Sequence, residues 1–257
     1  MDISLVIPVY KSQALVVGSV RRMVRAMEAS GRDYEILLRD DGSGAGMENI
    51  LRNIASKNPR IQCFCNPANE GLGSTLRTLF NDAKGDRVVY CDCDLPFGEH
   101  MIMELIGHLE RHDVALASRY AGGQSGASLL RRISSRVYYR LCKMLFQLPV
   151  VDIGSGTVAV RRDGLDQLTL RAKGFDIHAE FYVQAIKAGL SVTEVPAMAG
   201  RSQPGSFSIW RHGPGVVLGT LRLYFRGFKG GIYPEKDRYG WKKRFLNKSI
   251  RSKQPAL

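Results

Sequence analysis

The sequence lacks any apolar run long enough to cross a membrane. A spanning helix needs about 18 consecutive apolar residues, and every apolar stretch in the 257 residues is far shorter. Met1-Asp2-Ile3-Ser4 leads straight into the strand-like Leu5-Val6-Ile7, without a basic leader or a cleavage site. We therefore expect a cytoplasmic protein that is not integral to a membrane.

Cysteines are few, and their spacing is poor for a metal site. There are five, an odd number in a chain without an export signal, which indicates reduced thiols. Cys63 and Cys65 are separated by one residue, as are Cys91 and Cys93, whereas structural zinc pairs usually have two to four intervening residues. Small buried hydrophobic residues on strands are the better interpretation.

Acidic residues are scarce at the C-terminal end. Residues 201–257 hold thirteen Lys and Arg against two acids, which is +11 of the total net charge of +13. The first 200 residues are nearly balanced. A basic end on a balanced domain indicates an anionic partner, either membrane headgroups or nucleic acid.

The sequence does contain an alternation of strand and helix patterns, with enough hydrophobic residues (44%) for a full core. Short apolar runs predict strands at 3–7, 34–38, 61–65, 86–91, 114–118, 158–161 and 192–195. Amphipathic patterns between them predict helices at 15–27, 47–56, 74–83, 99–110, 128–147, 163–170 and 176–188. This order predicts an α/β fold with a mostly parallel sheet flanked by helices, which binds ligands beyond the carboxyl ends of its strands.

One such strand end carries the stretch around which the chain is organised, Cys91-Asp92-Cys93-Asp94-Leu95-Pro96. Two carboxylates at this position are poor core material, because each buried charge needs a partner. They offer hard oxygen ligands that Mg²⁺ or Mn²⁺ shares with a diphosphate. The motif by itself is more typical of a solvated turn than of a metal site, so the metal interpretation depends on the neighbouring motifs.

Four further stretches lie in the first half. Val6-Ile7-Pro8-Val9-Tyr10 and Asp40-Asp41-Gly42-Ser43 fall at predicted strand ends, Asn69-Glu70-Gly71-Leu72-Gly73 precedes a predicted helix, and Gly85-Asp86 leads into the strand that carries the Asp92 stretch. Together with the Asp92 stretch, they resemble the nucleotide-sugar half of the family 2 glycosyltransferases, which have the GT-A fold. The second half is similar to the polyprenyl-phosphate branch of that family, that of dolichol-phosphate mannose synthase. The matching residues there are Ser118-Arg119-Tyr120, Arg131 with Ser135, Val151-Asp152 with Ser155-Gly156, Glu180, and Val195-Pro196.

The resemblance implies a donor site for a GDP- or UDP-sugar. Pro8 and Tyr10 would pack on the base, and Asp40 or Asp41 would hydrogen-bond it. Asn69, Gly71 and Gly73 would let the backbone approach the ligand, Arg201 would contact the diphosphate, and Asp92 and Asp94 would hold the metal. Asp41-Gly42-Ser43 taken alone is an ordinary turn, and the two glycines taken alone are a helix N-terminal loop.

The resemblance also implies an acceptor site. Arg119, Arg131 and Ser135 would grip the phosphate of a polyprenyl phosphate, since an arginine fork matches phosphate bidentately. Asp152 is the candidate base if the acceptor is instead a hydroxyl. Glu180, on the polar side of its helix, is a further candidate catalytic residue. The alternatives are a solvated basic face around Arg131, a hydrogen-bonded loop aspartate and a plain surface glutamate.

Four features depart from the family pattern. Lys11-Ser12 stands where the family usually has Asn-Glu after the first strand. Pro96 stands where the lipid-phosphate branch commonly has Gln, which removes a third metal contact. His178 stands where the family usually has Asp. Arg201, followed by Gly205 and Ser206 or Ser208, resembles the family's Arg-Gly-Ser loop with one extra residue and no Lys.

The chain is expected to divide into a GT-A domain (1–210), an amphipathic helix (211–232) and a basic tail (233–257). After Pro214, one apolar helical face would hold Val217, Leu221, Tyr224 and Phe228, which is typical of a helix at a membrane surface. A helix that covers the core, followed by a solvated tail, is the alternative. Aromatics among the tail's lysines also suit single-stranded nucleic acid, but the lipid-phosphate motifs favour an anionic membrane surface, and no nucleic acid is expected.

These observations predict a metal-dependent inverting glycosyltransferase that moves a sugar to a polyprenyl phosphate at the cytoplasmic membrane face. A Gly/Ser-rich loop at 122–128 is a candidate lid. Two other hypotheses stay open. One is a glycosyltransferase that acts on a saccharide or small-molecule hydroxyl, and the other is a non-catalytic nucleotide-binding scaffold.

Overall fold

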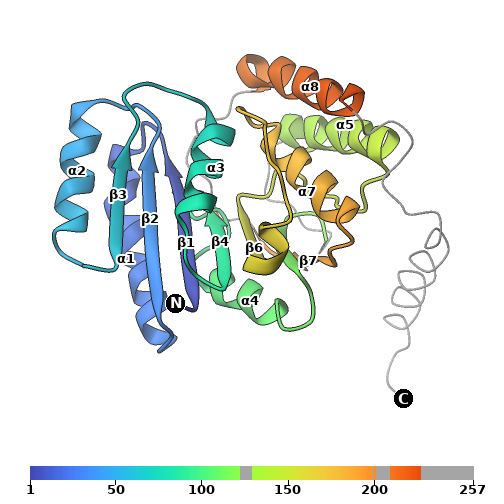
Figure 1. Cartoon of the computed structure of the whole chain (residues 1–257). Helices are drawn as coiled ribbons and strands as arrows, with labels where there is room; N and C mark the ends of the chain where they lie inside the picture. Colours follow the sequence, from blue (N-terminus) through green and yellow to red (C-terminus); the bar gives the residue numbers. More distant parts are fainter. Residues whose placement is uncertain (122–128, 199, 201–208, 227–257) are drawn as a thin grey trace.

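A computed structural model of the chain describes residues 1–121, 129–198, 200 and 209–226 (Figure 1). The candidate lid at 122–128, Arg201 and its following loop, and the tail at 233–257 lie outside these residues. Side chains are not described for 129–132 or 209–212, so the predicted role of Arg131 also falls outside. None of the helices in the described part is both long and apolar enough to cross a membrane.

The elements alternate along the chain as the apolar pattern predicts. The strands are β1 (Ile3–Val9), β2 (Tyr34–Asp40), β3 (Ile61–Cys65), β4 (Arg87–Cys91), β5 (Val114–Ser118), β6 (Thr157–Arg161) and β7 (Val192–Pro196). The helices are α1 (Gln13–Ala29), α2 (Ala45–Ala55), α3 (Leu72–Asp82), α4 (His100–His108), α5 (Leu129–Phe146), α6 (Arg162–Leu165), α7 (Ile177–Lys187) and α8 (Ile209–Phe225).

The seven strands form one sheet in the order β3-β2-β1-β4-β6-β5-β7. Six strands run the same way, and β6 runs against both of its neighbours. The mostly parallel sheet is therefore confirmed, with β6 as the exception. Its direction follows from α5, which leaves from the carboxyl end of β5 and returns to the same edge before β6 begins.

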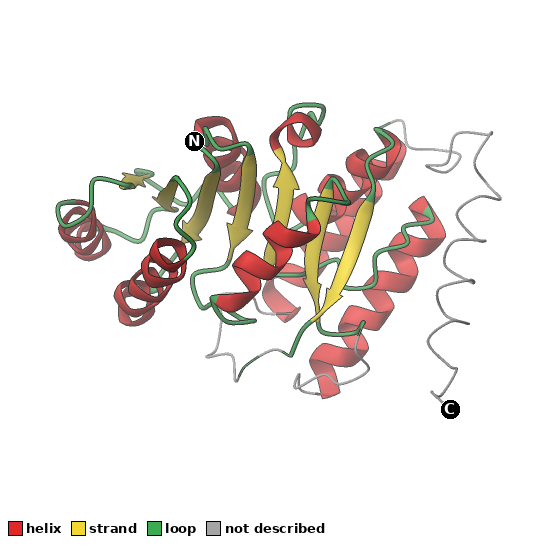
Figure 2. Ribbon diagram, turned by 90° about the horizontal axis from the view of Figure 1, so that it is seen from below, coloured by secondary structure: helices red, strands yellow, loops and turns green. Residues whose placement is uncertain are grey.

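The two faces of the sheet are covered by different helices (Figure 2). One core cluster packs α1, α2 and α4 against one side of β1, the side that carries Ile3, Leu5, Ile7 and Val9. The other joins α3, α5, α7 and Leu223 of α8 to the opposite side, where β1 presents Val6. Alternation of side chains along each strand explains how one strand serves two cores.

Two predicted element ends are wrong. Pro8 does not end β1, because β1 pairs with β4 only as far as Val6, and a residue without an N–H is tolerated where one strand neighbour is missing. The predicted helix at 163–170 is only the single turn α6. Helix α8 begins at Ile209, with Pro214 inside it.

The apolar face predicted for the last helix is also only partly right. Leu223 and Thr220 are buried against the domain, and Tyr224 packs edge-on against Phe146, with ring centroids 6.0 Å apart. The large hydrophobic residues that α8 exposes are Val217, Leu218 and Phe225. The sequence pattern shows an apolar stripe but not which edge of it the neighbouring helix covers.

The cysteines are all free thiols. Cys91 and Cys93 are buried, as expected for small hydrophobic residues on or near strands, and burial raises the pKa of Cys93 to about 12. Cys142 is buried on helix α5. Cys65 is exposed, so the prediction of burial is wrong for that residue. It lies on β3, which forms the edge of the sheet.

Candidate active site

The Asp92–Asp94 segment follows directly after β4. In the sheet, β2 and β3 lie on one side of β1, and β4 and the later strands lie on the other, so the order of the strands reverses between β1 and β4. The backbone N–H of Asp92 donates to the carbonyl of Gly156 at 2.7 Å, and the N–H of Leu95 donates to the carbonyl of Asp92 at 3.0 Å. The Tyr90 hydroxyl donates to Asp92 Oδ1. Asp92 and Asp94 are both half-buried, so a turn closed by β6 holds two partly exposed carboxylates at the sheet edge.

Gly156 has a specific reason to be glycine. A Cβ at this position would collide with the carboxylate of Asp92 and lie 3.1 Å from Cγ of Pro96. The resemblance motif Ser155-Gly156 therefore lies against the acidic segment in space, although more than sixty residues separate the two in sequence.

The carboxylates of Asp92 and Asp94 fit a metal ion for which the protein supplies only a few of the ligands. Within the described ranges, no group of three or more His, Cys, Asp and Glu side chains is arranged to hold a metal ion. Mg²⁺ typically takes one or two carboxylates together with substrate phosphates and water. Asp92 and Asp94 fit that role, provided that a diphosphate supplies further oxygens. The carbonyl of Pro96 accepts from the N–H of Gly200 at 2.9 Å.

Asp40 joins the ends of β1 and β2. Its carboxylate accepts from the Ser43 N–H at 2.8 Å and from the Ser43 hydroxyl at 2.5 Å, and the same hydroxyl accepts from the Lys11 N–H at 2.7 Å. Tyr10 is half-exposed beside this turn, with Lys11 Nζ 5.2 Å from its ring centroid. Pro8 and Tyr10 thus lie at the same edge as Asp40, as predicted, and their contact with a base stays a prediction.

Asp41 orders the loop that precedes α3. Its carboxylate accepts from the backbone N–H groups of Glu70 and Gly71 at 2.9 and 3.0 Å, and from Asn66 Nδ2 at 3.2 Å. Asn69 Nδ2 donates to the backbone carbonyl of Asp41 at 3.2 Å. The side chain is buried, so as arranged Asp41 fixes the 66–71 loop. Its backbone N–H donates to the carbonyl of Val9 at 2.8 Å, which ties the same residue to the end of β1.

Gly71 and Gly73 are required by the protein's own backbone. Gly71 has φ +93°, and a Cβ on it would collide with the carbonyl oxygen of Lys173. A Cβ on Gly73 would collide with the carbonyl oxygen of Ala172. The N–H groups of Gly73 and Ser74 donate to Lys173 O at 2.8 and 3.3 Å. The close approach at the start of α3 is therefore to residues 172–173, and an additional approach to ligand stays a prediction.

Glu180 does not lie on a polar surface, so that prediction is wrong. It is buried on α7, and its carboxylate accepts from the N–H groups of Arg171 and Ala172 at 2.8 and 2.7 Å. The residues that it holds are the ones that approach Gly73. Glu180 therefore positions the loop that packs against the start of α3, and a catalytic role for it stays a prediction.

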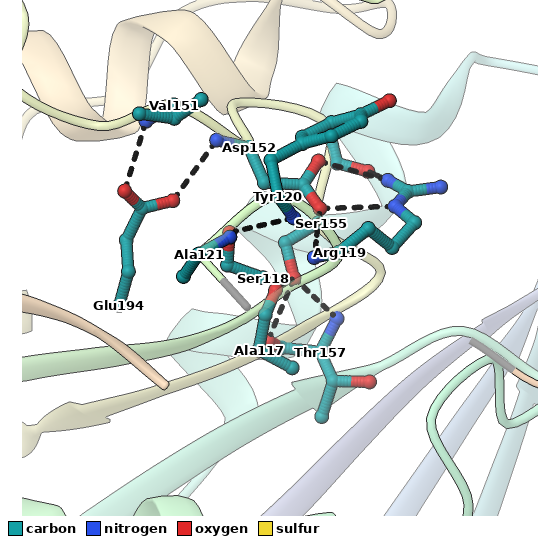
Figure 3. A network of polar contacts seen from close by, with 11 residues as sticks. Ala117, Ser118, Arg119, Tyr120, Ala121, Val151, Asp152, Ser155, Thr157 and Glu194 are labelled. Atoms are coloured by element: carbon teal, nitrogen blue, oxygen red, sulfur yellow. Dashed lines mark hydrogen bonds and ion pairs between the residues drawn. The ribbon is translucent and has the colours of Figure 1, made fainter. Parts of the chain in front are cut away.

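Arg119 and Asp152 form a buried ion pair at the ends of β5 and of the segment before β6 (Figure 3). Arg119 Nε and Nη2 donate to the two carboxylate oxygens at 2.9 Å each, and the Arg119 backbone N–H donates to Oδ2 at 2.9 Å. Nη2 also donates to the carbonyl of Gly154 at 2.8 Å. Burial alone would lower the pKa of Arg119, but Asp152 outweighs it and the pKa is raised.

This pair changes both roles assigned by resemblance. The fork of Arg119 is occupied by a carboxylate of the protein, and the carboxylate of Asp152 is neutralised by a guanidinium. Both carboxylate oxygens of Asp152 accept hydrogen bonds from Arg119, so an acceptor hydroxyl would have to compete with a buried guanidinium for them. The phosphate role of Arg119 and the base role of Asp152 both stay predictions that need the pair to open.

Glu194 supports the pair and was not identified from the sequence. Its carboxylate accepts from the N–H groups of Val151 and Asp152 at 3.1 and 2.9 Å (Figure 3), and burial raises its pKa. Ser155 completes the cluster, with its hydroxyl donating to Ala117 O at 2.6 Å. A glutamate inside the otherwise apolar strand 192–196 was the available signal.

His178 is a second residue without a predicted role. Its ring stacks on Tyr90, with centroids 5.7 Å apart, and its buried Nε2 has no hydrogen-bond partner within the described residues. Burial lowers the pKa of His178 to about 4, so the imidazole is neutral at pH 7. The residue that departs from the family pattern therefore packs behind the tyrosine that bonds Asp92.

The remaining predicted residues are only partly described. Ser135 is half-buried on α5. Gly85-Asp86 lies at the other edge of the sheet, before β4, where the Gly85 N–H donates to the Ser4 hydroxyl at 2.7 Å. A Cβ on Gly85 would lie 2.5 Å from the backbone nitrogen of Ser4, so this part of the resemblance serves the fold and not the site.

Comparisons with known proteins agree with this arrangement. The family model "Glycosyl transferase family 2" matches residues 4–169, which is more than half of the chain. Glycosyltransferase AglD from Haloferax volcanii is 26% identical over 205 residues, covering 76% of this chain and 32% of its own length. The chain thus spans about a third of that relative.

The fold is shared with a solved enzyme. Glucosyl-3-phosphoglycerate synthase from Mycobacterium tuberculosis, in complex with Mn²⁺, UDP-glucose and phosphoglyceric acid, superposes with a TM-score of 0.69 at 21% identity, covering 87% of this chain and 80% of that one. Its complex with Mg²⁺ and UDP superposes with a TM-score of 0.68 at 18% identity, covering 87% and 79%. With the family match, the strand order and the acidic segment after β4, the chain belongs to glycosyl transferase family 2.

Proposed function

We propose that the protein is a metal-dependent inverting glycosyltransferase that moves a sugar from a nucleoside-diphosphate sugar to a polyprenyl phosphate at the cytoplasmic face of a membrane. Family membership supports the transfer of a sugar. The observation that carries the choice of acceptor is the Arg119–Asp152 pair, because it ties up the carboxylate best placed to act as a base.

The donor half supplies binding and orientation. Tyr10, Asp40 and the Asp92–Asp94 segment meet at one edge, so a nucleotide lying across β1 and β4 would place its diphosphate near Asp92 and Asp94. These two carboxylates would hold Mg²⁺ or Mn²⁺, whose charge stabilises the departing nucleoside diphosphate. The solved neighbour with Mn²⁺ and UDP-glucose makes UDP-glucose the first donor to test, before GDP-sugars.

A phosphate acceptor suits the other half. A phosphate monoester is already anionic at neutral pH, so its oxygen attacks the anomeric carbon without a base that removes a proton. The C1–O bond to the nucleoside diphosphate breaks as the new C1–O bond to the lipid phosphate forms, with inversion at C1. Ser135, and Arg131 on the same helix, are the proposed phosphate contacts.

A second candidate is transfer to a hydroxyl of a small molecule. The solved neighbour whose name contains phosphoglycerate favours it, and Asp152 would then be the base. It requires Arg119 to release Asp152 when the acceptor binds. A non-catalytic scaffold is the third candidate, and Pro96 in the place of a metal-contacting residue is its support.

A donor screen separates these candidates. The full chain is incubated with Mn²⁺, a radiolabelled UDP- or GDP-sugar and membrane lipid, and label is counted in the organic phase. We expect label there with one donor, its loss in Asp92→Ala, and a strong reduction in Arg131→Ala. Transfer that survives unchanged in Arg131→Ala would contradict the lipid-phosphate contact, and no transfer or donor hydrolysis with any donor would favour the scaffold.

A further inference from the structure

Two neighbouring helices carry most of the exposed large hydrophobic side chains. Within the described residues there are nine such side chains, and six of them are on α5 and α8. Scattered single hydrophobic residues are normal on a protein surface, but a group of this kind marks an interaction surface. We name the six the α5–α8 ridge: Ile133, Val137, Met144, Val217, Leu218 and Phe225.

On each helix the exposed residues form a stripe opposite the buried side. Val137 is 60% and Met144 73% exposed, at a spacing of seven residues on α5, whereas Cys142 and Phe146 are buried on the other side of the helix. On α8, Leu218 and Phe225 have the same spacing, and Leu223 is the buried residue opposite them. The exposed positions are thus a consistent outer face and not frayed ends.

The two helices pack side by side, so their outer faces belong to one surface (Figure 1). The hydroxyls of Tyr138 and Thr220 lie 2.9 Å apart, and the rings of Phe146 and Tyr224 are in edge contact. Cys142, Phe146 and Leu223 belong to one core cluster. Both stripes therefore face away from the same core.

The charged residues on the two ridge helices have one sign. Neither α5 nor α8 contains an Asp or Glu. The exposed cations that flank the stripes are Arg136, Arg140, Lys143, Arg222 and Arg226. The half-buried carboxylate of Asp176 lies near Arg222 and Arg226. Apolar side chains flanked by exposed cations fit the interface of a bilayer with anionic headgroups, because the apolar groups insert and the cations pair with the lipids.

The ridge is connected to the site through α5. Helix α5 begins at Leu129, ten residues after Arg119, and ends at Phe146, six residues before Asp152. Both ends of α5 therefore connect to the carboxyl edge of the sheet, and Figure 1 shows α5 and α8 beyond the sheet at that end. A surface that the ridge contacts would lie near the acceptor half of the site.

We infer that the α5–α8 ridge docks the protein on an anionic lipid bilayer. This inference names the partner surface of the proposed function and rests on it in one respect, that a lipid-borne acceptor gives the docking its purpose. It assigns the contact to two folded helices, with α5 as an equal partner of α8, rather than to the C-terminal segment alone.

Vesicle flotation tests the inference. The full chain is mixed with vesicles of phosphatidylcholine, or of phosphatidylcholine with phosphatidylglycerol, and the floated fraction is measured at low and high salt. We expect flotation with the anionic vesicles that weakens with salt. Val137→Glu with Leu218→Glu should lower the partition coefficient about tenfold or more, because two inserting side chains become charged. Val17→Glu, at an exposed valine on α1, is the matched control and should float as the wild type does.

Thermal melting confirms that the variants fold, and transfer to detergent-dispersed polyprenyl phosphate provides the second readout. The double variant should keep that transfer while losing flotation. Flotation of the double variant equal to the wild type would overturn the ridge as the docking surface. Loss of a wild-type dimer in the double variant, with no flotation of either protein, would overturn it in favour of a contact between copies. Flotation of a wild type that never uses polyprenyl phosphate would overturn the proposed acceptor and leave the docking intact.

Discussion

Aspartates are held in different ways in the two halves of the molecule. In the donor half, Asp40 and Asp41 accept hydrogen bonds from neutral backbone and side-chain groups, and Asp92 and Asp94 remain partly exposed. In the acceptor half, Asp152 is buried against a guanidinium. The difference is that Asp152 is paired with a guanidinium, whereas the groups that donate to Asp40 and Asp41 are neutral.

This contrast bears on the acceptor's chemistry. Under the proposed function, the acceptor would enter beside a carboxylate that is already paired with a guanidinium. A phosphate acceptor suits this arrangement, because it is anionic and needs no base to remove a proton. Substitutions in either half of the molecule test this contrast.

Removal of Arg119 should have the largest effect. Arg119→Ala leaves the buried carboxylate of Asp152 without its cation, which costs about 3–5 kcal/mol of unfolding free energy. Urea denaturation measures the loss. Arg161→Ala is the control, since Arg161 and Asp163 form an exposed pair and their loss should change little. A loss in Arg119→Ala no larger than in Arg161→Ala would show that the buried pair is not needed.

Asp41 should come next, because its partners are neutral and partly accessible to water. Asp41→Ala leaves two backbone N–H groups and the Asn66 amide without their acceptor, at a cost of about 2–3 kcal/mol. Denaturation gives the stability, and hydrogen exchange of Glu70 and Gly71 should rise selectively. Unchanged exchange there would contradict the role of Asp41 in ordering the loop. Asp166→Ala, at an exposed aspartate, is the control.

His178 should make the stability depend on pH. Its pKa is about 4 in the folded protein against about 6.5 unfolded, so the unfolded state binds more protons between these values and stability falls as pH drops through the window. At pH 5 the loss attributable to His178 is about 2 kcal/mol relative to pH 7. His178→Phe should lack this component, whereas His100→Phe, at an exposed histidine, should keep it. Equal pH dependence in the wild type and His178→Phe would contradict the buried neutral imidazole.

Tyr90 should have the smallest effect, and one specific to the metal. Tyr90→Phe removes the hydroxyl that donates to Asp92 and should weaken Mn²⁺ binding about tenfold, as loss of a ligand's supporting hydrogen bond typically does. Electron paramagnetic resonance of Mn²⁺, with nucleoside diphosphate present, measures the affinity directly. Tyr138→Phe is the control, because it removes a tyrosine hydroxyl of α5 that contacts Thr220 of α8 and not Asp92. Equal affinities in all three proteins would show that Tyr90 does not orient Asp92.

The two halves also differ in how well sequence predicts them. The difference does not lie in the strands and helices, which in both halves agree with the sequence within a few residues apart from the helix predicted at 163–170, because alternation and amphipathic periodicity are local properties. The strand ends then brought Tyr10, Asp40 and Asp92 to one edge, as a parallel sheet requires.

What could not be predicted depends on contacts distant in sequence. The direction of β6 follows from the return of α5 to the carboxyl edge, which no local pattern reports. Arg119 and Asp152 meet across 33 residues, and both are polar in isolation. Glu180 reads as a surface glutamate on a helical wheel, and only the loop at 171–172 explains its burial.

The central claim is that the acceptor brings its own nucleophilic charge, and acceptor competition tests it most directly. The protein, Mn²⁺ and the labelled donor are offered a polyprenyl phosphate and the matching unphosphorylated polyprenol in equal amounts. We predict that the label enters the phosphorylated lipid alone, and that Asp152→Asn retains most of the transfer rate once the variant is shown to be folded. Comparable transfer to the polyprenol, or to a soluble saccharide, that is abolished by Asp152→Asn would contradict the claim.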